Sequence, residues 1–338
     1  MSIVIPPLGY NVLSLEYANE RTNILENEMD ELGYDYDITF TWEEAALGAS
    51  GQADILPTLG DIEGARLAVE RDMDLAYHGL HTTNYEGIYV RRGSDLDPEN
   101  TGSVEATFDK VIEENRLWGN AGWAQGEVPP GQIVIDNKFG HEYGEGGEFN
   151  VQSTDWNPLP QLLVDEEVDI IVNAPPLGTA PFDTEDPSPI KDILWYQPGL
   201  EEAGLDGRTI NLGQWVTSQE YSENNLEAIR ALMRAYQEGA RWMSNQDNHD
   251  EILSDEKNVD ALGGNTREEA RIILEFGTIP GAHAEAEPSN PYPAALSDLE
   301  MDEAFVETDK KALRAAQDRG FGPDGREDRI DYKHLSLE

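Results

Sequence analysis

Residues 38–60 read ITFTWEEAALGASGQADILPTLG, and this stretch decides how the chain folds. It begins in an alternating strand pattern over residues 36–40 and ends in a second apolar strand over residues 53–56. Thr41, with Glu44 three residues later, forms a capping box, which predicts a short helix between the two strands. A strand, a helix and a strand in this order indicate a parallel sheet with helices on its faces.

The loop at residues 57–60 carries no charged side chain, although the whole chain has a formal net charge of −45. In open parallel sheets, ligands bind beyond the carboxyl ends of the strands, where this loop is expected to lie. We therefore expect residues 57–60 to face a bound molecule and not the solvent.

The same alternation extends outward in both directions and then gives way to helices. It predicts an α/β protein with two lobes, residues 1–90 plus 205–338 and residues 91–204, in which the C-terminal helices return to lobe one. The further predicted strands lie at residues 3–5, 75–76, 87–90, 132–135, 168–172 and 211–216, and the further predicted helices at 14–32, 64–71, 159–164, 222–245, 267–276 and 301–319.

Charge is the strongest compositional signal. The chain has 68 Asp and Glu residues against 23 Lys and Arg, and the acids are spread along its length. Their repulsion opposes compaction at low salt but is screened at molar salt, where the Debye length is roughly 3 Å. We predict a protein from a halophile; a nucleic-acid mimic and a cation buffer are the alternatives. No basic patch is visible, so we expect no nucleic-acid partner.

The chain has no cysteine, which excludes disulfides, thiolate catalysis and zinc or iron–sulfur sites built on Cys. No apolar run reaches the roughly 18 residues that span a membrane. No signal peptide precedes the first strand, so the protein is either cytoplasmic or begins after a removed export segment. His78, His81 and the acid-flanked His141 could bind a metal, but we interpret them as ordinary polar side chains and expect neither metal nor cofactor.

Four segments in order resemble the solute-binding proteins of ABC transporters, in the group that takes nitrate, sulfonates, taurine and thiamin pyrimidine precursors. The resemblance implies a type II periplasmic-binding-like fold, with a mostly parallel sheet flanked by helices in each lobe and a ligand cleft between the lobes. The segments are ITFTWEEAALGASGQADI (38–55), IYVRRGSDL (88–96), LPQLLVDEEVDIIVNAPP (159–176) and WVTSQEYSENNLEAIRALMRAYQEGARWM (215–243).

This resemblance implies an extracytoplasmic receptor, anchored at the cell surface, that closes on a small polar or aromatic solute by hinge motion. Its partners would be that solute and an ABC permease, and the receptor itself would be a monomer. The main alternative is a cytoplasmic acid–base enzyme on the same fold, of the menaquinone or thiamin pathway. The lack of cysteine argues against an enzyme like the pyrimidine synthase of yeast thiamin synthesis, because that type relies on a Cys-rich stretch. A sensor domain of a regulator is a third alternative.

In lobe one, the resemblance places the pocket at strand-end loops. Tyr10 would stack on a flat ligand or pack between the lobes. Trp42 would form a pocket wall or lie in the core. Thr58 and Gly60 would bind a polar or anionic head or cap the next helix.

At the lobe junction, Thr83 and Asn84 would bind ligand from the hinge or serve as turn residues. In lobe two, Asn137 and His141 follow the predicted strand 132–135, and Asn173 follows strand 168–172. We expect these three side chains to make polar contacts with the ligand. The family usually starts this lobe with a strand, a turn and a full helix, whereas residues 131–149 leave little room for that helix.

Overall fold

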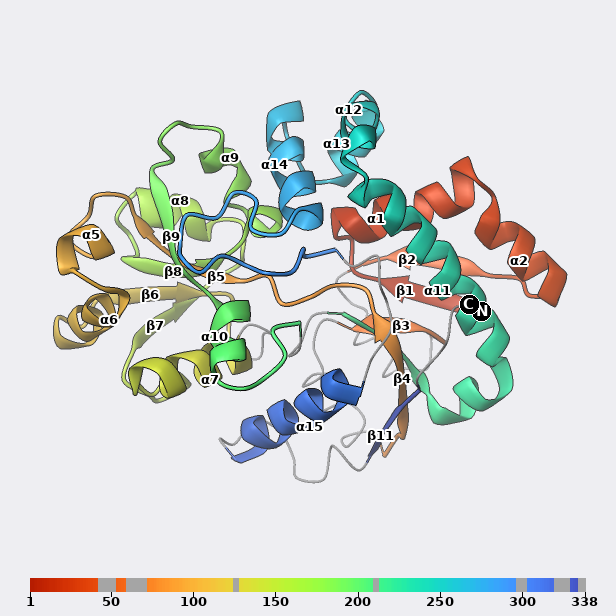
Figure 1. Cartoon of the computed structure of the whole chain (residues 1–338), viewed down its shortest axis with the longest axis horizontal. Coiled ribbons are helices and arrows are strands. Elements are labelled where there is room, and N and C mark those ends of the chain that lie inside the picture. Colours follow the sequence, from red (N-terminus) through yellow and green to blue (C-terminus); the bar gives the residue numbers. More distant parts are fainter. Residues whose placement is uncertain are drawn as a thin grey trace. The chain divides into compact units, whose positions relative to one another are not determined.

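The computed structural model describes residues 1–41, 53–58, 72–123, 128–208, 213–295, 303–318 and 329–333 (Figure 1). The chain divides into two compact units. The first unit comprises Met1–Thr83, Thr209–Gly263 and Ala295–Glu338, and the second comprises Asn84–Arg208 and Gly264–Ala294. These units differ from the predicted lobes mainly at residues 264–294, which pack with the second unit.

The first unit contains a four-stranded sheet in the order β11-β4-β10-β3 and a parallel pair, β1-β2, joined to the start of β3 by a bridge between Ile3 and Ile55. Strand β10 is antiparallel to both neighbours, whereas β11 runs parallel to β4. The strands are β1 (Ser2–Ile5), β2 (Asp37–Phe40), β3 (Leu56–Thr58), β4 (Leu75–Leu80), β10 (Gln214–Ser218) and β11 (Ile330–Tyr332).

The second unit contains one five-stranded sheet in the order β7-β6-β8-β5-β9. Strands β7, β6 and β8 are parallel, and β5 is antiparallel to both β8 and β9. The strands are β5 (Gly87–Arg91), β6 (Leu117–Asn120), β7 (Asn150–Ser153), β8 (Ile170–Asn173) and β9 (Ile190–Trp195).

The two sheets share one plan. In chain order within each unit, the first four parallel strands stand as second, first, third and fourth, with one antiparallel strand between the third and the fourth. The first unit adds β11 as a further parallel strand beside β4. That antiparallel strand directly follows a chain crossing between the units: β5 follows the crossing at Thr83 and Asn84, and β10 follows the crossing at Arg208 and Thr209. In each unit, therefore, the carboxyl ends of the parallel strands meet the segment through which the chain enters.

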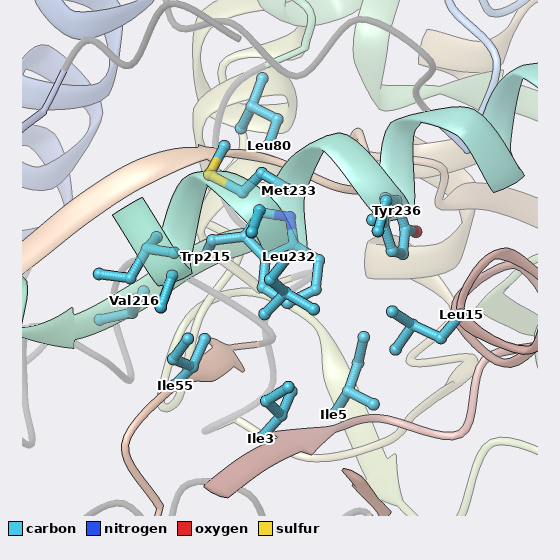
Figure 2. Close-up of a cluster of buried hydrophobic side chains, with 14 of the residues drawn as sticks. Ile3, Ile5, Leu15, Ile55, Leu80, Trp215, Val216, Leu232, Met233 and Tyr236 are labelled. Carbon is cyan, nitrogen blue, oxygen red and sulfur yellow. The ribbon is translucent and has the colours of Figure 1, made fainter. Parts of the chain in front are cut away.

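The core of the first unit is formed by its sheet and the long helix α11 (Gln219–Ser244) (Figure 2). Leu232, Met233 and Tyr236 of this helix are fully or almost fully buried, together with Ile3 and Trp215 of the strands. Ser218 begins the helix by accepting a hydrogen bond from the backbone N–H of Tyr221 at 3.1 Å. The cap satisfies one of the free N–H groups at the start of α11, and the apolar stripe of the helix shares one core with the strands.

Helix pairs pack closely through glycines in both units. A Cβ on Gly239 of α11 would lie 2.2 Å from the backbone oxygen of Ser14 in α1 (Gly9–Glu16). A Cβ on Gly199 of α10 (Tyr196–Glu202) would lie 2.5 Å from a methyl group of Val134 in α7 (Val128–Phe139). The first contact is limited by backbone and the second by the end of a side chain.

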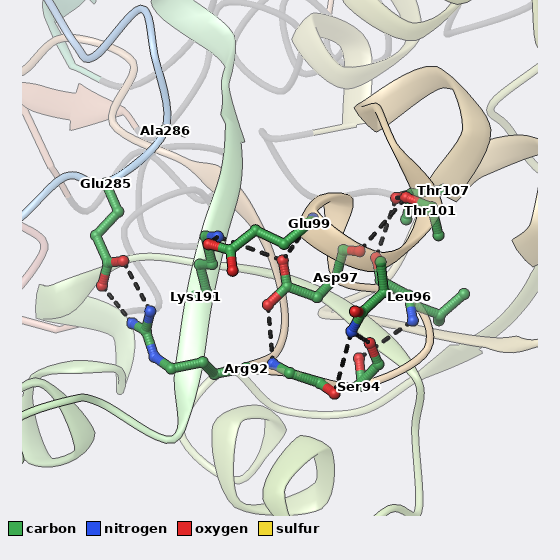
Figure 3. Close-up of polar contacts among 12 residues, drawn as sticks. Arg92, Ser94, Leu96, Asp97, Glu99, Thr101, Thr107, Lys191, Glu285 and Ala286 are labelled. Atoms are coloured by element: carbon green, nitrogen blue, oxygen red, sulfur yellow. Dashed lines mark hydrogen bonds and ion pairs between the residues drawn. The ribbon is translucent and has the colours of Figure 1, made fainter.

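A polar network holds the loop that follows β5 in the second unit (Figure 3). Asp97 accepts hydrogen bonds from the backbone N–H groups of Gly93 at 2.8 Å and Glu99 at 3.1 Å, and from Lys191 Nζ at 3.3 Å. Arg92 Nη1 donates to Glu285 Oε2 at 2.9 Å, which ties the loop to residues 285–286.

The remaining helices surround these sheets. They are the π-helical turn η1 (Tyr17–Arg21), α2 (Ile24–Leu32), α5 (Pro98–Thr101), α6 (Val104–Glu113), α8 (Leu159–Val164), η2 (Pro175–Leu177), α9 (Ala180–Asp183), η3 (Gln246–Asn248), α12 (His249–Ile252), α13 (Glu256–Ala261), α14 (Arg267–Thr278) and α15 (Glu303–Asp318).

Most predicted elements are confirmed, and two are wrong. Residues 132–135 form part of helix α7 and not a strand, because the β-branched run Ile133–Ile135 is buried within a helix that packs against α10. The predicted helix at 14–32 is two helices separated at Asn23, whose φ of 54° breaks the helical geometry. The short helix predicted after Thr41 and the helix predicted at 64–71 lie outside the described residues. The loop predicted at 57–60 begins within β3, which extends to Thr58.

Candidate functional site

Uncharged polar side chains gather at the carboxyl end of the second-unit sheet. Asn120 ends β6, Ser153 ends β7 and Asn173 ends β8, and all three strands point the same way. The antiparallel strand β5 starts at this end, so the residues before Gly87 lie here too. Amide and hydroxyl groups can both donate and accept hydrogen bonds, which suits a polar solute.

Asn120 is fully buried, and the N–H groups of its side-chain amide are not used in hydrogen bonds within the described residues. Its Oδ1 accepts hydrogen bonds from Ser153 Oγ at 2.9 Å and from the N–H of Gly122 at 3.1 Å. Its Nδ2 has no hydrogen-bond partner among the described residues. Because a buried N–H group without a partner is unfavourable, this amide is suited to bind a ligand oxygen or nitrogen.

Asn173 is buried as well, but its side chain is used within the unit. Its Nδ2 donates to the carbonyl of Trp156 at 3.0 Å, and its Oδ1 accepts from the N–H of Ala174 at 2.8 Å. These bonds fix the turn that follows β8.

A second amide ties together the entrance to β5 and the exit from β9. Gln197 is fully buried in α10, and its Nε2 donates to the carbonyl of Asn84. Its Oε1 accepts from the N–H of Tyr292 at 3.0 Å. The side chain of Asn84 in turn accepts from the N–H of Glu86 at 3.3 Å. The chain therefore enters this unit through a segment of fixed geometry.

Glu86 is the chemically distinctive residue at this end of the sheet. Only 1% of its surface is exposed, and its carbonyl accepts from the N–H of Tyr196 at 3.2 Å. The carboxyl oxygen Oε2 has no hydrogen-bond partner among the described residues. Burial raises the pKa of Glu86 to about 8, against a smaller opposing effect of backbone hydrogen bonds. The folded, ligand-free unit thus holds a carboxyl group that is mostly protonated at neutral pH.

The carboxyl end of the first-unit sheet has a more aromatic lining. His81 directly follows β4 and is fully buried, with its ring edge-on to Trp215 at 5.6 Å between centroids and to Tyr236 at 6.2 Å. Its Nδ1 lies 2.8 Å from the hydroxyl of Thr82. Burial lowers the pKa of His81 to about 3, so the ring is neutral at physiological pH. Gly213 packs on this ring, because a Cβ there would lie 2.6 Å from it.

The segment after β1 joins this aromatic group. The hydroxyl of Tyr236 donates to Asn11 Oδ1 at 2.8 Å, and Asn11 Nδ2 donates to the carbonyl of Pro6 at 3.1 Å. Tyr10 is fully buried, and burial raises its pKa. The fully buried Thr83 ends the first unit at the same end of the sheet.

The structure brings some predicted site residues together and separates others. In the second unit, Asn84 and Asn173 lie at the carboxyl end of the sheet. Asn137 is exposed on α7, because the segment before it is helical and not a strand. His141 lies 3.1 Å from Asp109 and 3.6 Å from Glu148 through its two ring nitrogens, so it pairs with acids of α6 and the 141–149 loop.

In the first unit, Tyr10 and Thr83 are described, but other predicted residues are not. Trp42 and Gly60 lie outside the described residues, and Thr58 is described only as the last residue of β3. His78 and His81 are separated by three positions in an extended segment, which places them on opposite faces. His78 lies 2.9 Å from the hydroxyl of Thr217. Within the described ranges, no three His, Asp or Glu side chains are grouped as metal ligands would be.

Glu86, Asn120 and Gln197 were missed by sequence reasoning. Asn120 ends LWGN, a four-residue strand too short for its alternation to stand out. Glu86 directly precedes a correctly predicted strand, and a residue at that position was identifiable from the sequence as lying at the end of the sheet where ligands bind. Among 68 acidic residues, however, nothing in the sequence marks one that is buried.

No family model and no curated protein matches the sequence. Solved structures do match over nearly the whole chain. The periplasmic aliphatic sulphonate-binding protein SsuA from Escherichia coli has a TM-score of 0.68 at 11% identity and covers 100% of this chain and 93% of its own. The chain has the two-lobed periplasmic-binding-protein fold.

Two further structures of this fold extend the likeness. The nitrate-binding protein NrtA from Synechocystis PCC 6803 has a TM-score of 0.60 at 11% identity, with 97% of this chain and 83% of that chain covered. The alkanesulfonate-binding protein SsuA from Xanthomonas axonopodis pv. citri, bound to MOPS, has a TM-score of 0.61 at 11% identity, with 98% of each chain covered. The predicted type II fold is confirmed, whereas identities this low carry no information on the solute.

None of the described helices combines the length and the apolar character needed to cross a membrane.

Proposed function

We propose that the protein is the extracytoplasmic solute-binding component of an ABC importer, which captures a small polar solute and presents it to a membrane permease. One observation carries the proposal: each unit places buried polar or aromatic side chains at the carboxyl end of a sheet built on the same plan. In open α/β sheets this is the end at which ligands bind. The solute-binding proteins of similar structure support the same role.

The lining supports recognition by hydrogen bonds. In the second unit, Asn120 offers a buried N–H donor, and Glu86 offers a buried carboxyl oxygen. In the first unit, neutral aromatic rings surround His81. We propose that Tyr10, Thr83 and Asn84 also contact the solute, and that the two units close on it by hinge motion. Trp42, Gly60 and Thr58, which is the last residue of β3, remain proposed contacts.

A binding screen with recovery of the compound tests the proposal. The protein is melted with solutes at millimolar concentration, and any hit is recovered and analysed by mass spectrometry. A solute at 1,000 times its dissociation constant stabilises the fold by about 4 kcal/mol, which shifts the melting curve measurably. We expect the compound to be recovered unchanged. A hit that is consumed would replace the receptor with an enzyme on the same fold.

We further propose that the protein works at high salt, as in a halophile. The formal net charge of −45 opposes compaction until salt screens it. We expect the melting temperature to rise steadily as KCl increases from about 0.1 M to about 2 M. A melting temperature that is flat over this range would argue against this adaptation.

A further inference from the structure

The second unit holds a carboxyl group at the end of the sheet where the proposed receptor would bind its solute. Glu86 immediately precedes β5, and β5 pairs through Gly87 with Asn173 of β8 and Trp195 of β9. Glu86 therefore stands at the same end of the sheet as the last residue of β8 and the first residue of α10. Backbone hydrogen bonds fix it on both sides: its N–H donates to Asn84, and its carbonyl accepts from Tyr196.

The packing around Glu86 leaves one of its carboxyl oxygens without a hydrogen-bond partner among the described residues. Gly87 next to it packs on the ring of Trp195, because a Cβ on Gly87 would lie 2.8 Å from that ring. The tryptophan N–H is already bonded to Asp192 at 2.6 Å. Glu86 Oε2 is buried without a hydrogen-bond partner among the described residues. A buried carboxyl group avoids the cost of an unpaired charge either by staying protonated or by pairing with a positively charged donor.

A positively charged N–H donor next to Glu86 would favour the ionised form of this carboxyl group, in which both oxygens only accept hydrogen bonds. A nitrate or sulfonate group has no N–H to offer and carries the same charge as an ionised carboxylate. An amine, amidine or guanidine supplies both the donor and the opposite charge. Asn120 at the end of β6 can contribute a donor to an acceptor atom of the same solute, since its Nδ2 is buried without a partner in the described part of the chain.

We propose that Glu86 is a specificity-determining binding residue and that the solute carries a basic nitrogen group with N–H donors, such as an amine, amidine or guanidine. This inference rests on the receptor function proposed above. It assigns to this chain a class of solute opposite in charge to those named for the sulfonate- and nitrate-binding proteins of similar structure.

The test uses two sets of probes matched in shape and opposite in charge. Guanidinium and nitrate are both planar with threefold symmetry, and benzamidine and benzenesulfonate share a phenyl ring. Agmatine and aminopyrimidines extend the nitrogen set, and short alkanesulfonates extend the anion set. Binding to the full chain in KCl is measured by calorimetry for wild type, E86Q and E285Q. The E285Q variant makes the same Glu-to-Gln change in the same unit but at the residue paired with Arg92.

We expect wild type to bind at least one compound of the nitrogen set, and E86Q to bind it roughly 10- to 100-fold more weakly. The E285Q variant should bind as wild type does. E86D, which keeps the charge on a shorter side chain, should retain the preference for the nitrogen set with reduced affinity. Melting curves of each variant show that weaker binding does not reflect unfolding.

Two outcomes would overturn the inference, and they are distinguishable. If wild type binds only the anion set, or if E86Q binds a nitrogen compound as tightly as wild type, then the role of Glu86 is wrong while the receptor function stands. If wild type binds no compound of either set, this inference fails, and the receptor function fails only if the wider solute screen described above also finds no ligand.

Discussion

The two units build the same sheet but line its carboxyl end with opposite chemistry. In the first unit, His81 is buried among Trp215 and Tyr236, and its pKa falls to about 3. In the second unit, Glu86 is buried beside amide side chains, and its pKa rises to about 8. Burial is the main cause in both cases, and it neutralises whichever group it covers. A shared strand order therefore fixes which positions lie at the carboxyl end of each sheet, while the residue types at those positions determine their chemistry.

The largest expected effect of this contrast is a loss of folding stability as pH rises above neutrality. The pKa of Glu86 is raised on folding, so the folded state holds its proton more tightly than the unfolded chain. Stability is highest below pH 4.5 with respect to this group and falls as pH rises toward 8. The expected loss for the ligand-free protein is on the order of 5 kcal/mol.

Glu86→Gln removes this ionisation and keeps the shape of the side chain. We expect E86Q to unfold at higher denaturant concentration than wild type at pH 8.5, and the difference to shrink toward pH 4.5. Urea titrations across this range measure it. Parallel pH profiles of E86Q and wild type would mean that Glu86 is not buried as an acid.

The first unit should respond to pH in the opposite direction. The pKa of His81 is lowered on folding, so its contribution to stability is complete above pH 6.5 and is lost as pH falls toward 3. His81→Phe should flatten this acid limb while keeping an aromatic ring against Trp215. Burial also lowers the pKa of His78, to about 4, so a smaller acid limb should remain. An H81F profile as steep as that of wild type would contradict the assignment.

The sequence predicted the positions of several strands better than it predicted the residues that line the carboxyl ends of the sheets. The alternating run Tyr36–Phe40 and the apolar run at 168–172 identified β2 and β8, because strand periodicity is a local property. Helix α7 was missed, because the β-branched run Ile133–Ile135 has a local preference for strand that packing against α10 overrides. Glu86 was missed for a similar reason: burial depends on the whole fold, and an acid in this chain looks like any other.

A second comparison concerns the two glycine contacts between helices. Gly239→Ala would place a Cβ against the backbone oxygen of Ser14, which cannot move without shifting α1. Gly199→Ala would place its Cβ against the side chain of Val134, with no backbone atom among its nearest neighbours. We expect G239A to lose about 3 kcal/mol or more of the free energy of unfolding, and G199A about 1 kcal/mol. Chemical denaturation of both variants measures the difference.

The matched control replaces the side chain that G199A meets. Adding Val134→Ala to G199A should relieve the clash, so the double variant should lose less than the sum of its parts. Strict additivity of these two substitutions, or equal losses in G239A and G199A, would show that the two helix contacts do not differ as described.

The smallest expected effect contrasts two ion pairs of the second unit (Figure 3). Burial alone would raise the pKa of Asp97, but hydrogen bonds from the backbone N–H groups of Gly93 and Glu99 and from Lys191 lower it. Its contribution to stability is therefore present above pH 3.8 and is lost as pH falls further.

The side chain of Asp97 is 2% exposed, whereas that of Glu285, paired with Arg92, is 46% exposed. Asp97→Asn should cost about 2 kcal/mol and Glu285→Gln less than about 1 kcal/mol at low salt. At about 1 M KCl the effect of E285Q on stability should vanish, because salt screens exposed charges. Most of the effect of D97N should remain, because backbone donors and burial maintain the contribution of Asp97. Urea unfolding of both variants at the two salt concentrations tests this, and a loss in D97N that salt abolishes would show that Asp97 acts as a surface charge and not as the buried anchor of its loop.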